Sequence, residues 1–103
     1  MKVFLDDERT PPKDWVLVRW PEEAIDLLKT GKVSEISLDH DLGDDEHGTG
    51  NGVILWIEEQ VVTNSFNPPK ITVHSANASA RKKMEAGIKS IIRFNEMNKK
   101  GPR

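Results

Sequence analysis

The chain has 103 residues and a formal net charge of -2, with 31% charged and 36% hydrophobic residues. These values predict one folded domain and argue against a disordered chain or a polyanion-binding surface, so we expect no binding to duplex DNA. Cysteine is absent, which excludes disulfides and thiolate zinc sites, and the apolar run before Asp6 is too short for a signal peptide or a membrane span, so we expect a cytoplasmic protein without membrane contact.

The first half of the chain alternates short apolar runs with polar segments. Residues 2–5 form an apolar run that ends in acids, which is typical of a strand buried on both faces. Residues 8–14 contain two prolines and no apolar period, which predicts a loop. Residues 15–20 are rich in β-forming side chains and predict a second strand. Pro21 then suits the first turn of a helix that Gly31 closes.

The second half of the chain repeats this alternation. Residues 35–38 predict a strand that runs into Asp39, and a polar stretch over 40–51 leads into a helix over 52–63. A further strand is expected over 71–73, and it too ends in polar residues. Strands that alternate with helices through short connections predict right-handed crossovers and an α/β fold with a mostly parallel sheet of four or five strands.

The C-terminal part of the chain carries one more helical pattern. Asn77 or Ser79 is expected to cap an amphipathic helix that follows the last strand. Residues 91–94 fit either an edge strand or the end of that helix. We expect a single domain over 1–94 and a frayed polar tail over 95–103.

Four aspartates, Asp6, Asp7, Asp39 and Asp41, follow two strands of the predicted sheet. Ligands of parallel α/β sheets bind beyond the carboxyl ends of the strands, so we expect these carboxylates to meet at one edge. Clustered carboxylates repel one another unless a cation or protons compensate them, and their hard oxygen atoms suit Mg²⁺, or Mn²⁺ in its place. Taken singly, each aspartate is better explained as a turn former or a helix cap.

Two histidines are expected at the same edge, His40 beside the acids and His74 after the last strand. Neighbouring carboxylates favour the protonated form of an imidazole, which suits acid–base catalysis, so either ring is able to protonate a leaving oxygen. Each histidine is equally consistent with a hydrogen-bonded scaffold residue.

Three side chains near this edge are suited to a phosphate. Arg9, two residues past the acid pair, offers a bidentate guanidinium. Ser75 and Asn77 are able to donate hydrogen bonds to phosphate oxygens. Both serve equally well as caps of the helix that follows.

A loop with three glycines precedes the helix over 52–63. Gly48, Thr49 and Gly50 offer backbone amides near a helix N-terminus, an arrangement that favours an anion such as a phosphate of the substrate. The run lacks the lysine of a P-loop, and a mobile lid or a plain loop explains it better. His47, in the acidic part of this loop, is expected to be solvated.

Three strand-end motifs resemble those of response-regulator receiver domains: Val-Phe-Leu-Asp-Asp-Glu from residue 3, Ser-Leu-Asp from residue 37 and Val-His-Ser-Ala from residue 73. The resemblance implies a small flavodoxin-like fold of three layers. It also implies that Asp6, Asp7 and Asp39 bind Mg²⁺ with the backbone of Asp41, and that Ser75 contacts a phosphoryl group. The first and last helices of a receiver are expected to be reduced or missing, and no lysine-proline pair on a fifth strand is recognisable, so phosphorelay signalling is not expected.

Four motifs together are more similar to cyclic-phosphate-processing receiver domains, a reduced receiver-derived family, over residues 2–94. They are Asp-Asp-Glu-Arg, Leu-Asp-His-Asp-Leu-Gly, Gly-Thr-Gly and His-Ser-Ala-Asn. This resemblance implies a role on cyclic phosphates, such as 2′,3′-cyclic ends in RNA repair or in nucleotide signalling. We therefore expect a Mg²⁺-dependent phosphoesterase that hydrolyses a cyclic phosphate on an RNA end or a nucleotide, with Asp39, His40 and His74 as catalytic residues. The alternative is a non-catalytic receiver-like module that binds a phosphate ligand or a protein partner in signalling.

Overall fold

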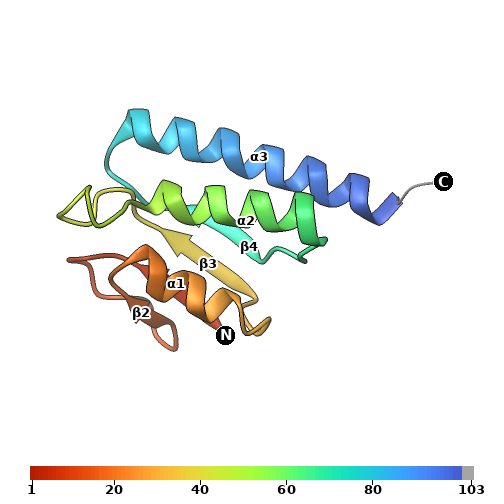
Figure 1. Cartoon of the computed structure of the whole chain (residues 1–103). Coiled ribbons are helices and arrows are strands. Elements are labelled where there is room, and N and C mark those ends of the chain that lie inside the picture. Colours follow the sequence, from red (N-terminus) through yellow and green to blue (C-terminus); the bar gives the residue numbers. More distant parts are fainter. Residues whose placement is uncertain (101–103) are drawn as a thin grey trace.

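A computed structural model describes residues 1–100 of the chain, in which two strands come first and helices and strands alternate after them (Figure 1). The strands are β1 (Lys2–Leu5), β2 (Val16–Val18), β3 (Glu35–Leu38) and β4 (Lys70–Val73). The helices are α1 (Pro21–Leu28), α2 (Gly50–Asn64) and α3 (Ala78–Lys100). The predicted order of the elements is confirmed.

The four strands form one parallel sheet in the order β2-β1-β3-β4, which confirms the predicted sheet type. Leu5, the last residue of β1, pairs with Val18 of β2 on one side and with Leu38 of β3 on the other. Leu38 in turn pairs with Val73 of β4. All four strands therefore end at the same level, and the polar residues that follow them begin at one edge of the sheet.

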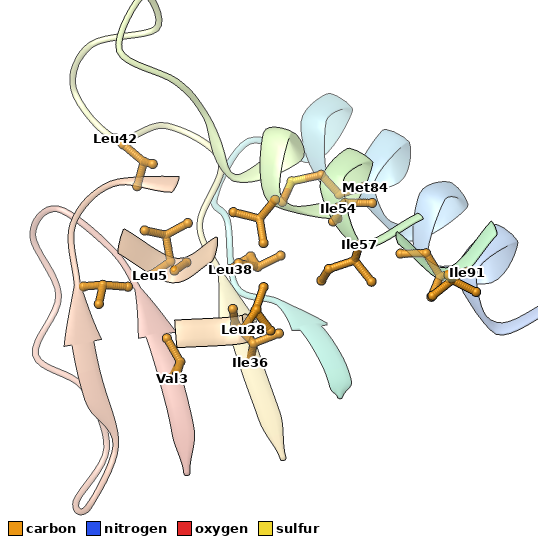
Figure 2. Close-up of a cluster of buried hydrophobic side chains, with 14 residues drawn as sticks. Val3, Leu5, Leu28, Ile36, Leu38, Leu42, Ile54, Ile57, Met84 and Ile91 are labelled. Atoms are coloured by element: carbon orange, nitrogen blue, oxygen red, sulfur yellow. The ribbon is translucent and has the colours of Figure 1, made fainter. Parts of the chain in front are cut away.

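All three helices pack on one face of the sheet. The connections from β2 to β3 and from β3 to β4 advance across the sheet in the same direction, and right-handed crossovers that do so place their helices on the same face. Figure 1 shows α2 and α3 lying side by side along this face. Figure 2 shows the core between the sheet and the helices, which includes Val3, Leu5, Ile36 and Leu38 from the strands and Leu28, Ile54, Ile57, Met84 and Ile91 from the helices.

The opposite face of the sheet is covered by a loop. Phe4 points toward this face because strand residues alternate, and it is nevertheless only 7% exposed. The connection from β1 to β2 runs in the reverse direction across the sheet, and its last residue, Trp15, packs edge-on against Phe4 with ring centroids 6.3 Å apart. The third layer of the predicted fold is this loop, since the described residues contain no helix at the position of a receiver's first one.

The last helix extends further than expected. Residues 91–94, which fitted either a strand or a helix, are helical, and Ile91 is buried against the core. The expectation of a frayed tail is wrong for residues 95–100, because the helix continues there and Asn98 Nδ2 donates a hydrogen bond to the carbonyl oxygen of Val61 in α2 at 2.7 Å. Positions 101–103 of the expected tail lie outside the described residues. None of the helices within residues 1–100 combines the length and the apolar character needed to cross a membrane.

Candidate active site

The candidate site lies at the carboxyl edge of the sheet, on the face that the loop covers. Asp6 and Asp39 directly follow Leu5 and Leu38, which point into the core, so the alternation of strand residues directs both carboxylates to the opposite face. His74 follows β4 in the same way. One ligand atom from each of Asp6, Asp39 and His74 lies within 4.8 Å of the other two. The three strand ends therefore converge as predicted.

Asp6 is the most constrained carboxylate of the site. It is 2% exposed, and its Oδ1 accepts hydrogen bonds from the backbone amides of Glu8 at 2.7 Å and Arg9 at 2.9 Å. Its Oδ2 lies 3.0 Å from Arg9 Nη1 and 2.8 Å from His74 Nε2. Burial by itself would raise the pKa of Asp6, but the amides of Arg9 and Glu8, the guanidinium and His74 outweigh burial and lower the pKa to about 2. Asp6 is therefore a carboxylate whose two oxygens both have partners.

His74 is held through both of its ring nitrogens. Nε2 donates to Asp6, because an ionised carboxylate only accepts hydrogen bonds, and Nδ1 lies 2.7 Å from Ser37 Oγ. The ring also stacks on Phe4, with centroids 4.2 Å apart and planes 4° from parallel. These contacts match the scaffold role that the sequence left open for His74.

Arg9 lies between the two buried carboxylates. Its Nη1 is 3.0 Å from Asp6 Oδ2 and 3.4 Å from Asp39 Oδ2, and its side chain is 48% exposed. The hydrogen bond to Asp6 and the negative charge of that residue raise the pKa of Arg9 above its ordinary value. Asp39 has a further partner, since its Oδ1 accepts the backbone amide of His40 at 2.8 Å. The guanidinium therefore supplies the positive charge that the clustered carboxylates were expected to need.

His40 differs from His74 in having a free ring nitrogen. Its Nδ1 lies 2.9 Å from Asp41 Oδ1, whereas Nε2 has no hydrogen-bond partner within residues 1–100. The hydrogen bond from His40 is the main cause that lowers the pKa of Asp41, and the side-chain amide of Asn77, 3.4 Å from Asp41 Oδ2, adds to it. The imidazole of His40 is thus oriented by a carboxylate at Nδ1, and its side chain is 20% exposed.

A pocket of about 310 Å³ opens beside three of these residues, Arg9, Asp39 and Asp41. Its lining residues are Asp7, Glu8, Arg9, Asp39, Asp41, Gly43 and Ala76. Four carboxylates and one guanidinium suit a cation accompanied by an anion better than an apolar ligand. Two larger hollows, of about 580 and 530 Å³, lie between β4 and α3, share no lining residue with this pocket, and include several isoleucines in their linings.

The carboxylates at and beside this pocket fit a divalent cation. Asp6 and Asp39 offer buried hard oxygens, and a guanidinium already stands as a positive charge between them. Asp7, predicted as a further ligand, lines the pocket but does not belong to the cluster within 4.8 Å. Its Oδ2 and Arg19 Nη2 both approach Gly43, where an added Cβ would lie 3.3 and 3.5 Å from them.

The glycine run before α2 lies beside the site without lining the pocket. Gly50 abuts the backbone of Asp39 so closely that an added Cβ would overlap its carbonyl oxygen. Gly48, with a φ of +134°, packs on Pro21, and Thr49 is the N-cap residue of α2. The structure therefore brings Gly43 to the pocket instead of Gly48, Thr49 and Gly50.

Ser75 and Asn77 form the turn into α3. Ser75 is 2% exposed, and its Oγ accepts the backbone amide of Asn77 at 3.1 Å. Asn77 Oδ1 accepts the amide of Ala80 at 3.0 Å, which confirms the capping role proposed for Asn77. Its amide nitrogen reaches Asp41, so the same side chain connects the helix cap to the site. The hydroxyl proton of Ser75 is left for donation.

His47 is exposed, as the sequence indicated, but its ring is also in contact with the start of α1. Its ring stacks on Trp20 with centroids 3.8 Å apart, and its Nε2 lies 3.0 Å from Glu22 Oε1. The side chain remains 38% exposed. These contacts fasten the loop after β3 onto the start of α1.

Sequence reasoning missed four contributors to the site. Ser37 and Phe4, which hold the His74 ring, each stand two positions before an aspartate of the site and so share its face of the sheet. This spacing of two residues could have indicated that both side chains lie on the face of the site. Gly43 and Arg19 carried no signal, because the approach of Asp7 and Arg19 to Gly43 depends on how the loops fold.

Comparison with known proteins gives one family assignment. The sequence model of the family described as cyclic-phosphate processing Receiver domain matches residues 1–90. No curated protein and no solved structure matches the chain. The matched segment contains all four strands and every site residue described above.

Proposed function

The chain belongs to the family of cyclic-phosphate processing receiver domains, and from this premise we propose that it hydrolyses a cyclic phosphate on an RNA end or a free nucleotide with the help of a divalent cation. The observation that carries the proposal is the carboxyl edge of the sheet beside the pocket, where two buried carboxylates share a guanidinium and are followed in the chain by an imidazole with a nitrogen that is unpaired within residues 1–100. The carboxylates are those of Asp6 and Asp39, the guanidinium is that of Arg9, and the imidazole is that of His40.

Hydrolysis of a cyclic phosphate joins a water oxygen to phosphorus and breaks one of the two ester bonds of the ring. The departing oxygen takes a proton, and the product is a phosphomonoester. In the proposal His40 Nε2 provides this proton, because Nδ1 is held by Asp41 and Nε2 has no protein partner within residues 1–100. His74 acts as a positioning residue, since both of its nitrogens are engaged in holding Asp6 and Ser37.

Mg²⁺ or Mn²⁺, when bound, would supply Lewis-acid polarisation of the phosphoryl group. Asp6 and Asp39 would hold the ion, and Asp41 and Asp7 line the pocket that Asp39 also lines. Arg9 presents donors to the non-bridging phosphate oxygens, and Ser75 retains one hydroxyl proton for the same purpose.

Turnover of 2′,3′-cyclic nucleotides in the presence of Mg²⁺ or Mn²⁺ tests the proposal. We expect Asp39→Ala to abolish turnover and His40→Gln to lower it by about 10²-fold or more, the usual contribution of a general acid. His47→Gln is the matched control, because His47 contacts Trp20 and Glu22 outside the pocket, and it should retain activity.

Equal turnover by the wild type and Asp39→Ala would contradict the proposal. Stabilisation of the fold by Mg²⁺ with beryllofluoride, or by a cyclic nucleotide, without any turnover would instead identify a non-catalytic binding module. A thermal-shift series run beside the activity assay separates these two outcomes.

A further inference from the structure

Arg9 occupies the place between the buried carboxylates that a cation is expected to take. One nitrogen, Nη1, contacts Asp6 Oδ2 at 3.0 Å and Asp39 Oδ2 at 3.4 Å. Asp6 and Asp39 are 2% and 6% exposed, so water does little to screen their charges. The guanidinium is therefore an internal counter-ion for both.

A divalent cation that bridges the same two oxygens cannot share them with this guanidinium. Mg²⁺ binds carboxylate oxygens at about 2.0–2.1 Å, well inside the hydrogen-bond distances that Arg9 makes, and the two positive charges repel each other. The side chain of Arg9 is able to leave without disturbing the loop. Its backbone amide, which donates to Asp6 Oδ1 at 2.9 Å, provides an anchor that does not depend on the side chain.

A phosphate in the pocket would give the released guanidinium a partner that spreads over several of its nitrogens. The side chain of Arg9 is 48% exposed and lines the pocket, and its Nη2 and Nε have no acceptor within the described part of the chain. Asp7, Glu8 and Asp41 line the same pocket and repel a phosphate that arrives without a cation. The guanidinium of Arg9 therefore opposes a cation that binds alone, and the carboxylates oppose a phosphate that binds alone. Each ligand neutralises the charge that opposes the other.

We propose that Arg9 and a divalent cation compete for one position between Asp6 and Asp39, and that a phosphate ligand draws Arg9 away and thereby couples its own binding to that of the cation. The inference rests on the proposed function, which supplies the two ligands, a divalent cation and a phosphate. It adds that the binding of each ligand depends on the other. Because coupling between sites is reciprocal, the cation tightens phosphate binding by the same factor.

Isothermal titration of the full chain with Mg²⁺, in the absence and presence of inorganic phosphate, tests this coupling. For the wild type we expect phosphate to tighten Mg²⁺ binding by about fivefold or more, the lower end of the range usual for coupled sites. For Arg9→Gln we expect Mg²⁺ alone to bind several times more tightly than to the wild type, and phosphate to change its affinity less. Arg93→Gln removes the same charge from an exposed position on α3 and should behave as the wild type.

A second variant, Arg9→Lys, keeps the positive charge and loses the planar fork. It should show the Mg²⁺ affinity of the wild type and weaker phosphate binding, which a purely structural role of Arg9 would not produce. Equal Mg²⁺ affinity of the wild type and Arg9→Gln would overturn the inference. If the wild type nevertheless turned over 2′,3′-cyclic nucleotides, the proposed function would still stand. Absence of Mg²⁺ binding from every variant would overturn both.

Discussion

At Asp6, two backbone amides, a guanidinium and an imidazole meet a single buried carboxylate. The folded chain holds the pKa of this group at about 2, below its ordinary value of 3.8. A depressed pKa means that the unfolded chain binds the proton more readily than the folded one. The stability that Asp6 contributes is therefore complete above the pKa of the unfolded chain and is lost as the pH falls toward 2.

Replacement of Asp6 by Asn should remove this pH dependence. We expect Asp6→Asn to lower the free energy of unfolding of the metal-free chain at pH 7 by roughly 2 kcal/mol, because one pKa unit corresponds to about 1.4 kcal/mol. Urea unfolding between pH 7 and pH 2 should show the two proteins converging below about pH 4. Parallel curves over this whole interval would mean that the interactions of Asp6 do not favour its ionised form.

The two histidines with extensive ring contacts should differ in their effect on stability. His74→Ala removes contacts to Ser37 and Asp6 and the stack on Phe4, and we expect it to destabilise the chain by about 2–4 kcal/mol. His47→Ala removes an exposed stack on Trp20 and an exposed contact to Glu22 and should cost less than about 1 kcal/mol. Chemical denaturation of both variants measures the difference, and equal losses would show that the His74 network is not a scaffold.

At the scale of single residues, the sequence predicted which polar groups gather but not how they pair. Asp6, Asp39 and His74 were predictable because parallel strands of matched register end at one level. The position of Arg9 between two carboxylates was not, since its side chain follows an irregular loop whose path depends on tertiary contacts. The free nitrogen of His40 likewise depends on the rotamer that Asp41 selects.

Among the elements, α2 begins directly against the backbone of a site residue. Its first residue, Gly50, lies against the carbonyl of Asp39, where no side chain fits, whereas Gly52 faces open space. Gly50 is therefore required for the close approach of two backbone segments. Gly52 has no such role and carries only the general cost of a glycine in a helix.

Alanine at these two positions gives a matched test. Gly50→Ala should destabilise the chain by at least about 2 kcal/mol, because the start of α2 has to move away from β3. Gly52→Ala should be neutral or should stabilise the chain by up to about 1 kcal/mol, since alanine is the better helix former. Thermal or urea unfolding compares them, and a neutral Gly50→Ala would contradict the observed contact.

The elements also show where reasoning from sequence patterns stops. The strands and α1 were predictable from apolar runs with clear boundaries. The end of α3 was not, because residues 95–100 are polar, and the contact from Asn98 to the last turn of α2 depends on how two helices pack. The loop that covers Phe4 had no periodic pattern, so its role as a layer became visible only in three dimensions.

In the whole molecule, the apolar core and the candidate site lie on opposite faces of one sheet. The helices bury Val3, Leu5 and Leu38 on one side, while Asp6, Asp39 and His74 lie on the other. Substitutions in the pocket are therefore expected to leave the core intact. Charge removal in the pocket should change ligand binding more than it changes the fold.

Ligand-linked stability tests this separation. Mg²⁺ together with a cyclic nucleotide should raise the melting temperature of the wild type, since a ligand at 100 times its Kd contributes about 2.7 kcal/mol. Asp39→Asn should melt within a few degrees of the unliganded wild type and show little further response to the ligands. A full response in Asp39→Asn would place the ligand site elsewhere.

The most direct test is a crystal of the chain grown with Mg²⁺ and a 2′,3′-cyclic nucleotide. We predict density for the metal ion between Asp6 and Asp39, with the phosphate of the nucleotide or its monoester product in the same pocket and the Arg9 guanidinium turned toward it. Density for the ligand in the hollows between β4 and α3, with Arg9 still bridging Asp6 and Asp39, would contradict the proposed site and the function built on it.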